Sequence, residues 1–125
     1  MIKNQFFAYR NGIVAQTLRD AGDPHPRIFG LQLPQIAAIA REIGFDEVKA
    51  RQLWADRDCR ESRLLACYLF DPETLEEEDA MALATDVITR EEADILAWRL
   101  LRRLPYASAL SLSGYIAEAL RRNLQ

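Results

Sequence analysis

The chain has 125 residues, a net charge of −3 and a half-hydrophobic composition, which together predict one globular domain over residues 1–125. No apolar run approaches the roughly 18 residues of a membrane span, and the N-terminus lacks a signal peptide's apolar stretch. We therefore expect a cytoplasmic protein without a membrane partner. The acidic balance is uncommon among dedicated nucleic-acid binders, but it leaves DNA binding open where basic residues cluster on one face.

Helical patterns dominate the first third of the chain. Residues 3–21 are expected to form one helix, with core side chains Phe6, Ile13, Val14 and Leu18. Residues 22–26 end this helix, because two prolines with Gly and Asp cannot continue it. Residues 27–33 are then expected to cross the surface as an ordered loop.

The next helices are bounded by capping signals. Pro34 suits the first turn of a helix, and Gly44 suits the left-handed position that ends it. The apolar stripe of this helix contains Ile36, Ala37, Ile39, Ala40 and Ile43. Asp46 is a good N-cap for a helix through Trp54, whose indole we expect in the core, and another helix covers residues 60–70.

The second half is also helical. Residues 71–73, Asp-Pro-Glu, are typical of a helix start. Thr89 and Glu92 match a capping box that opens a helix to about Leu104, and a last helix covers residues 106–124. No segment shows the two-residue alternation of a strand, so the fold class is all-α with about seven helices, arranged as stacked helical repeats or as an irregular helical bundle.

Opposite charges are segregated along the second half of the chain. Six acidic residues and no basic residue lie between Asp71 and Asp79, whereas residues 99–103 and 121–122 hold five arginines. The arginines have two interpretations, as contacts to DNA phosphates or as groups that complement the dipole at helix ends.

Two cysteines and one histidine restrict the chemistry. Cys59 and Cys67 lie about 12 Å apart on one expected helix, too far for a disulfide. We expect Cys67 to be a buried structural thiol, while Cys59, near a helix start, is a candidate for a lowered thiol pKa. His25 is the only histidine and lies between two prolines, so we expect neither a metal site nor a cofactor.

One block of the sequence carries a family resemblance. Leu53-Trp54, Arg60-Glu61-x-Arg63-Leu64-Leu65-Ala66 and Leu69-x-Asp71-Pro72-Glu73 together resemble the DNA alkylation repair proteins of the AlkD-like type. Further similar stretches cover residues 11–19, 29–42 and 104–108. The resemblance implies a right-handed superhelical stack of HEAT-like antiparallel helix pairs. Because the family members are substantially longer, it also implies a shortened relative or a piece of a longer protein.

The resemblance implies a DNA N-glycosylase, a hydrolase that excises alkylated purines. In the family a carboxylate stabilises the positive charge that develops on the deoxyribose, and aromatic side chains support it. Aligning residues 94–101 places Asp94 at the carboxylate position, with Trp98 as a candidate catalytic aromatic. The family's other aromatic position falls on Arg90, which argues against catalysis. Arg90 and Asp94 are also spaced for a surface ion pair on one helix.

Four arginines are the candidate DNA-binding residues: Arg90, Arg99, Arg102 and Arg103. Trp98 is a stacking platform in one interpretation and a core residue in the other. Glu61 lies beside an apolar stripe, so we expect it to bond neighbouring backbone or to pair with an arginine, for which Arg60 and Arg63 are candidates.

Three functions follow from these residues. The first is binding to the backbone of double-stranded DNA by a repair-like protein with little or no glycosylase activity. The second is a non-catalytic protein-protein interaction module, and the third is an active alkylpurine DNA N-glycosylase. Self-association is a further expectation, because a terminal repeat without its neighbour exposes an apolar face.

Overall fold

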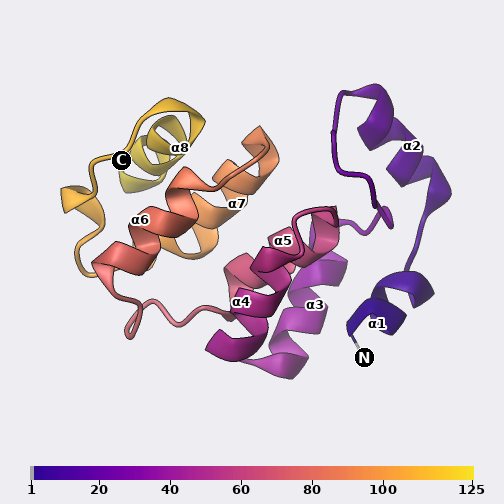
Figure 1. Ribbon diagram of the computed structural model, residues 1–125, viewed down its shortest axis with the longest axis horizontal. Coiled ribbons are helices and arrows are strands. Elements are labelled where there is room, and N and C mark those ends of the chain that lie inside the picture. Colours follow the sequence, from indigo (N-terminus) through magenta and orange to yellow (C-terminus); the bar gives the residue numbers. More distant parts are fainter. Residues whose placement is uncertain (1) are drawn as a thin grey trace. The chain divides into compact units, whose positions relative to one another are not determined.

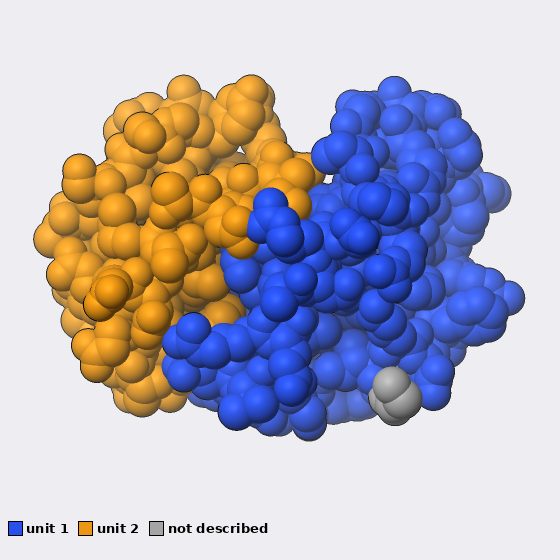
Figure 2. All heavy atoms as spheres, viewed as in Figure 1, with its two compact units in different colours: residues 1–69 blue, residues 70–125 orange. Residues whose placement is uncertain are grey.

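The computed structural model describes residues 2–125, which form eight α-helices, two short 3-10 helices and no strand (Figure 1). The all-α prediction is confirmed. The α-helices are α1 Ile2–Ala8, α2 Gly12–Asp20, α3 Leu33–Ile43, α4 Glu47–Ala55, α5 Arg60–Leu69, α6 Glu77–Thr85, α7 Arg90–Arg99 and α8 Gly114–Leu124. The 3-10 helices are η1 Leu101–Arg103 and η2 Ala107–Ala109. The chain divides into two compact units, residues 1–69 and 70–125, coloured separately in Figure 2.

Helix α5 is the centre of the first unit. Each of its ten residues is buried, and both α3 and α4 pack against it. The N–H of Asp46 donates to the carbonyl of Leu69 (2.9 Å), and Nη1 of Arg63 donates to the carbonyl of Trp54 (2.8 Å). The first bond joins the start of α4 to the end of α5, and the second joins the end of α4 to the start of α5. The two helices therefore form an antiparallel pair.

The buried charges of α5 are held by the loop over residues 27–32. The carboxylate of Glu61 accepts the N–H of Phe29 at 2.9 Å and that of Gly30 at 3.0 Å. Nη1 of Arg60 donates to Glu61 at 2.7 Å and to the carbonyl of Leu31 at 2.8 Å. The expectation that Glu61 pairs with Arg60 is therefore confirmed, whereas the backbone that Glu61 bonds belongs to a loop about 30 residues away rather than to its neighbours. Glu61 and Arg60 also satisfy backbone N–H and carbonyl groups of the loop that would be costly to bury without a hydrogen-bonding partner.

The sequence predicted one helix over residues 3–21, but the structure has two, α1 and α2. The chain breaks between α1 and α2, where the Asn11 side chain caps α2 by accepting the N–H of Ile13 and Val14. Phe6 is fully buried as expected, but Ile13 is 82% exposed and α2 contains no buried residue. The apolar residues of α2 thus suggested a core that this helix does not enter.

Gly30 allows the loop to approach α2 closely. Its φ is +88°, and the Asn11 N–H donates to the carbonyl of the neighbouring Phe29 at 2.8 Å. A Cβ at position 30 would lie 2.1 Å from the Asn11 carbonyl oxygen. Only glycine fits both the left-handed backbone and this contact.

Helix boundaries in the second half differ from those expected. The Asp71 side chain caps a tight turn by accepting the N–H of Glu73 at 2.9 Å, and α6 begins only at Glu77. Helix α7 ends at Arg99, after which the chain continues through η1 and η2. The last helix was expected from residue 106, but α8 begins only at Gly114, after η2 and the segment over residues 110–113.

Helices α7 and α8 pack together in the second unit. The guanidinium of Arg90 lies over the ring of Tyr115, with 4.3 Å between Cζ and the ring centroid. This contact joins the first turns of the two helices, which an antiparallel pair would place at opposite ends. The α7–α8 pair therefore departs from the antiparallel pairing that the resemblance implied.

Several local predictions are confirmed. The Asp46 side chain accepts the N–H of Lys49 and caps α4, and Gly44 ends α3 with a φ of +76°. Trp54 is 7% exposed and belongs to the core, as expected. No helix among residues 2–125 combines the length and apolar character needed to cross a bilayer.

Candidate nucleic-acid interface

Helix α7 carries most of the predicted site residues, and it begins after Thr89, the predicted N-cap. The Thr89 hydroxyl accepts the N–H of Glu92 at 3.1 Å, and the Glu92 carboxylate reaches back to the N–H of Ile88 at 2.9 Å. Glu92 is completely buried. The Thr89 cap is therefore confirmed, whereas Glu92 bonds the residue before the cap instead of the Thr89 N–H that a capping box requires.

Asp94 forms an ion pair, but not with the residue suggested by the sequence. Its Oδ1 lies 2.8 Å from Nη2 of Arg122 on α8. The side chains of Asp94 and Arg122 are 45% and 58% exposed, so water screens this pair. The carboxylate that the resemblance assigns to catalysis is therefore held by a surface guanidinium that a ligand can displace at little cost.

Arg90 is engaged elsewhere on α8. Its guanidinium covers the exposed ring of Tyr115 rather than pairing with Asp94. Nine residues separate Arg90 from Arg99, which corresponds to about 14 Å along a helix. The structure therefore separates Arg90 from the other three predicted DNA-binding arginines.

Trp98 faces outward near the end of α7, with 41% of its surface exposed. The Cζ atoms of Arg99 and Arg102 lie 5.2 and 5.9 Å from its ring centroid. Nε of Arg102 also donates to the carbonyl of Trp98 at 2.7 Å, which closes the helix end. An exposed indole can stack on an unpaired base of a nucleic acid, and the two guanidinium groups beside it attract the phosphates.

Three arginines lie close together where α7 passes into η1. Burial, followed by repulsion from Arg99 and Arg102, lowers the pKa of Arg103. Guanidinium groups that repel one another in this way gain when an anion is placed among them. We name Trp98, Arg99, Arg102 and Arg103 the α7–η1 cluster; it contains four of the six predicted site residues.

The acidic run lies elsewhere on the second unit. The Tyr106 hydroxyl donates to the carbonyl of Leu75 at 2.6 Å. Burial, and then the charges of Glu76, Glu77 and Asp79, raise the pKa of this hydroxyl. These acids are therefore positioned around η2, and a polyanion that approaches the α7–η1 cluster has to avoid them.

The arginines of α5 do not contribute to a surface site. Arg60 and Arg63 are 3% and 0% exposed, and the Arg63 guanidinium stacks on the Trp54 ring with 3.6 Å from Cζ to the centroid. The most recognisable block of the sequence is thus a packing element.

Both cysteines are free and buried, as the sequence predicted for Cys67. Burial raises the pKa of the Cys59 thiol, an effect that outweighs the hydrogen bonds of Ser62. The lowered pKa considered for Cys59 is therefore wrong, because the thiol lies under the loop at the isolated bridge between Arg27 and Cys59 rather than at an open helix end.

Sequence reasoning missed two partners of α7, Tyr115 and Arg122. Helical periodicity predicts which residues of α8 share a face, but it does not predict which helix that face contacts. Among the described residues no group of three or more His, Cys, Asp or Glu side chains could hold a metal ion. Comparisons with protein-family models, with curated proteins and with solved structures find no match.

Proposed function

We propose that this chain is a helical-repeat protein related to the DNA alkylation repair family and that it binds double-stranded DNA through the α7–η1 cluster. The observation that carries the proposal is the exposed indole of Trp98 beside the mutually repelling arginines at residues 99, 102 and 103. Arginines supply the phosphate contacts that dominate affinity for DNA, and an indole supplies an apolar face for a sugar or for a base that has left the duplex stack. The proposal includes a HEAT-like superhelical arrangement of the helices, which the antiparallel α4–α5 pair supports and from which the α7–α8 pair departs.

Binding to a labelled duplex at several salt concentrations tests the proposal. The double variant Arg102→Ala/Arg103→Ala should bind more weakly, and its dependence of log K on log salt should be shallower by about two, since each lost phosphate contact removes roughly 0.9. The matched control Arg41→Ala/Arg51→Ala removes two exposed positive charges from the first unit and should leave the slope unchanged. Equal slopes for both double variants would contradict the proposed interface.

Tryptophan fluorescence gives an independent readout. Trp54 is buried, so quenching of emission by added DNA should come from the exposed Trp98. The variant Trp98→Phe should abolish the quenching while keeping part of the affinity. Quenching that persists in this variant would show that DNA changes the first unit instead.

Base excision is kept apart from this proposal, because Arg90 stands where the resemblance places the family's other aromatic residue. Release of free base from a methylated duplex tests it directly. Base release by the unaltered protein that disappears in Asp94→Asn would mean that the chain is an active glycosylase. Salt-sensitive binding without base release would mean that it binds DNA without the chemistry.

A second candidate function, a protein-protein interaction module, is favoured by the exposed apolar side chains around the start of α4. Phe45 and Val48 are 63% and 68% exposed. Binding through such a surface changes little with salt and is lost in Phe45→Ser/Val48→Ser. That result, together with absent DNA binding, would select this function.

A further inference from the structure

The second unit contains a pocket, lined by both apolar and polar side chains, that the proposed DNA interface does not use. Its volume is about 320 Å³, within the lower range for small-molecule sites. Its walls come from η2, from the segment over residues 110–113, from α8 and from the residue after α8. Most of the apolar lining comes from Leu110, Leu112, Ala117, Leu120 and Leu124.

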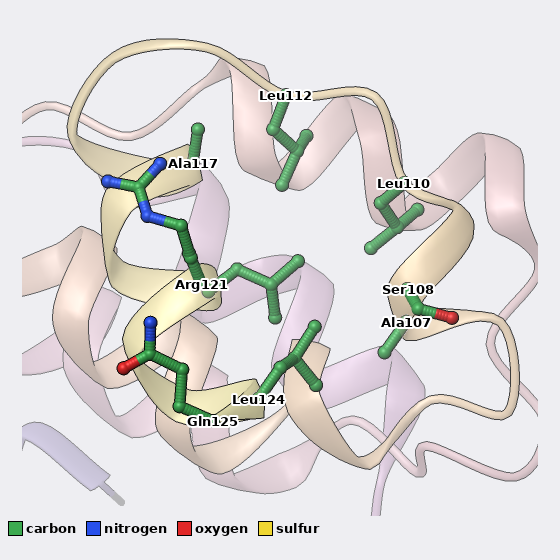
Figure 3. A pocket seen from close by; sticks show the side chains of 9 residues that line it. Ala107, Ser108, Leu110, Leu112, Ala117, Arg121, Leu124 and Gln125 are labelled. Carbon is green, nitrogen blue, oxygen red and sulfur yellow. The ribbon is translucent and has the colours of Figure 1, made fainter.

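The side chains around the pocket are arranged like those of a site for an amphipathic molecule. In Figure 3 the side chains of Leu110, Leu112 and Leu124 converge on one space, while the Arg121 side chain runs past Ala117 and its guanidinium lies outside that space. Six of the nine lining residues are Ala or Leu, so an alkyl or aryl group gains from leaving water there.

The polar groups at the pocket have no intramolecular role. Among residues 2–125, no hydrogen bond or ion pair engages the side chains of Ser108, Arg121 or Gln125. The adjacent Arg122 is different, because it pairs with Asp94. Arg121 is therefore a guanidinium at the edge of the pocket without an acid of its own.

We propose that this pocket binds an amphipathic monocarboxylate, with its apolar chain among the leucines and its carboxylate on Arg121. A guanidinium offers two parallel N–H donors that match the two oxygens of a carboxylate. Ser108 and Gln125 are the further donors near the edge. The proposal is independent of DNA binding, since it uses none of the residues of the α7–η1 cluster.

Octanoate is the probe for the first experiment, with 1-octanol as the uncharged counterpart of similar length. Backbone amide shifts in ¹H–¹⁵N NMR spectra locate weak binding. We expect octanoate to shift the amides of residues 107–112 and 117–125 and to bind about tenfold more tightly than octanol, because the charge-assisted bond is lost in the alcohol. Shifts outside these residues, or none, would overturn the proposal.

Two adjacent arginines provide a matched comparison. Arg121→Gln should lower the affinity for octanoate about tenfold and leave that for octanol unchanged. Arg122→Gln removes the same charge from the same helical turn but lies at Asp94, so it should keep most of the octanoate affinity. Equal losses in both variants would mean general electrostatic attraction and would overturn a specific carboxylate site.

Filling the pocket tests the apolar part. Ala117 is half-buried at the pocket wall, and Ala117→Phe should abolish binding of both probes while the amide spectrum of the first unit stays unchanged. A second copy of the chain is the competing occupant. Pocket amides that shift with protein concentration in the absence of octanoate, together with a dimer in sedimentation, would replace the proposed ligand by a self-association surface.

Discussion

The arginines of α5 and those at the end of α7 are the same residue type in opposite environments. Arg60 and Arg63 are enclosed by the protein and donate to a carboxylate and to backbone carbonyls. The arginines of the α7–η1 cluster lie where they repel one another and flank an exposed indole. The contrast teaches that an arginine-rich motif indicates function only after its hydrogen-bonding partners are known.

The difference has an energetic side. Buried charges are costly to leave alone, so the α5 network tolerates no missing member. The guanidinium groups of the α7–η1 cluster are partly exposed, so removing one costs less, and the positive potential of the others remains for a ligand. We therefore expect substitutions in α5 to act on stability and substitutions in the α7–η1 cluster to act on binding.

The largest expected effect is that of Glu61→Ala. The substitution leaves the Arg60 guanidinium buried without its carboxylate and two loop N–H groups without acceptors, which should lower the free energy of unfolding by about 3–5 kcal/mol. Urea denaturation measures the loss. The exposed Glu42→Ala is the control and should change stability by less than about 0.5 kcal/mol. A loss below about 1 kcal/mol for Glu61→Ala would show that the network is not structural.

The apolar side of α5 should be nearly as sensitive. Leu65 is completely buried, and Leu65→Ala should cost about 2–5 kcal/mol through lost burial and a cavity. Val48→Ala, at a 68% exposed position of α4, is the comparison for a truncation that creates no cavity. Similar urea midpoints for both variants would place Leu65 outside the core.

A smaller effect is expected where α7 meets α8. The half-exposed pair of Asp94 and Arg122 should contribute about 0.2–1 kcal/mol. A double-mutant cycle of Asp94→Asn and Arg122→Gln isolates this coupling, which should fall further as salt is added. A coupling above about 2 kcal/mol would mean that α7 is fixed by this pair as firmly as the loop is fixed by Glu61.

The smallest effect on stability is expected in the α7–η1 cluster. Replacing both Arg102 and Arg103 by alanine should change the free energy of unfolding by less than about 0.5 kcal/mol beyond the loss of one hydrogen bond to Trp98. The same variant should show the altered salt dependence of DNA binding. Severe destabilisation would make these arginines structural, like those of α5, and would remove the comparison.

Local signals in the sequence predicted much of the helical structure. Asp46 and Thr89 cap helices by bonding an N–H three residues ahead, so the sequence around each contains all the information needed. Asp71 was wrong as a helix signal, because an Asp-Pro pair caps an isolated turn as well as it caps a helix.

Partners far apart along the chain could not be predicted in this way. Glu61 was expected to meet backbone and arginine, but Phe29 and Gly30 lie more than 30 residues away. Arg122 lies 28 residues from Asp94, and only tertiary packing decides that it, rather than the neighbouring Arg90, holds the carboxylate. The chemical type of each contact was readable, whereas the identity of its partner was not.

The contact between Gly30 and Asn11 restricts which sequences can adopt this fold. A methyl group at position 30 would meet a backbone oxygen, which no change of side chain can relieve. Glycines 12, 22, 44 and 114 have open space where a Cβ would lie. In a saturation library selected for folded protein, position 30 should therefore be the glycine least able to vary. The close approach of this loop to the start of α2 therefore depends on glycine at position 30, and we expect it to tolerate substitution less than the loop positions of the other glycines do.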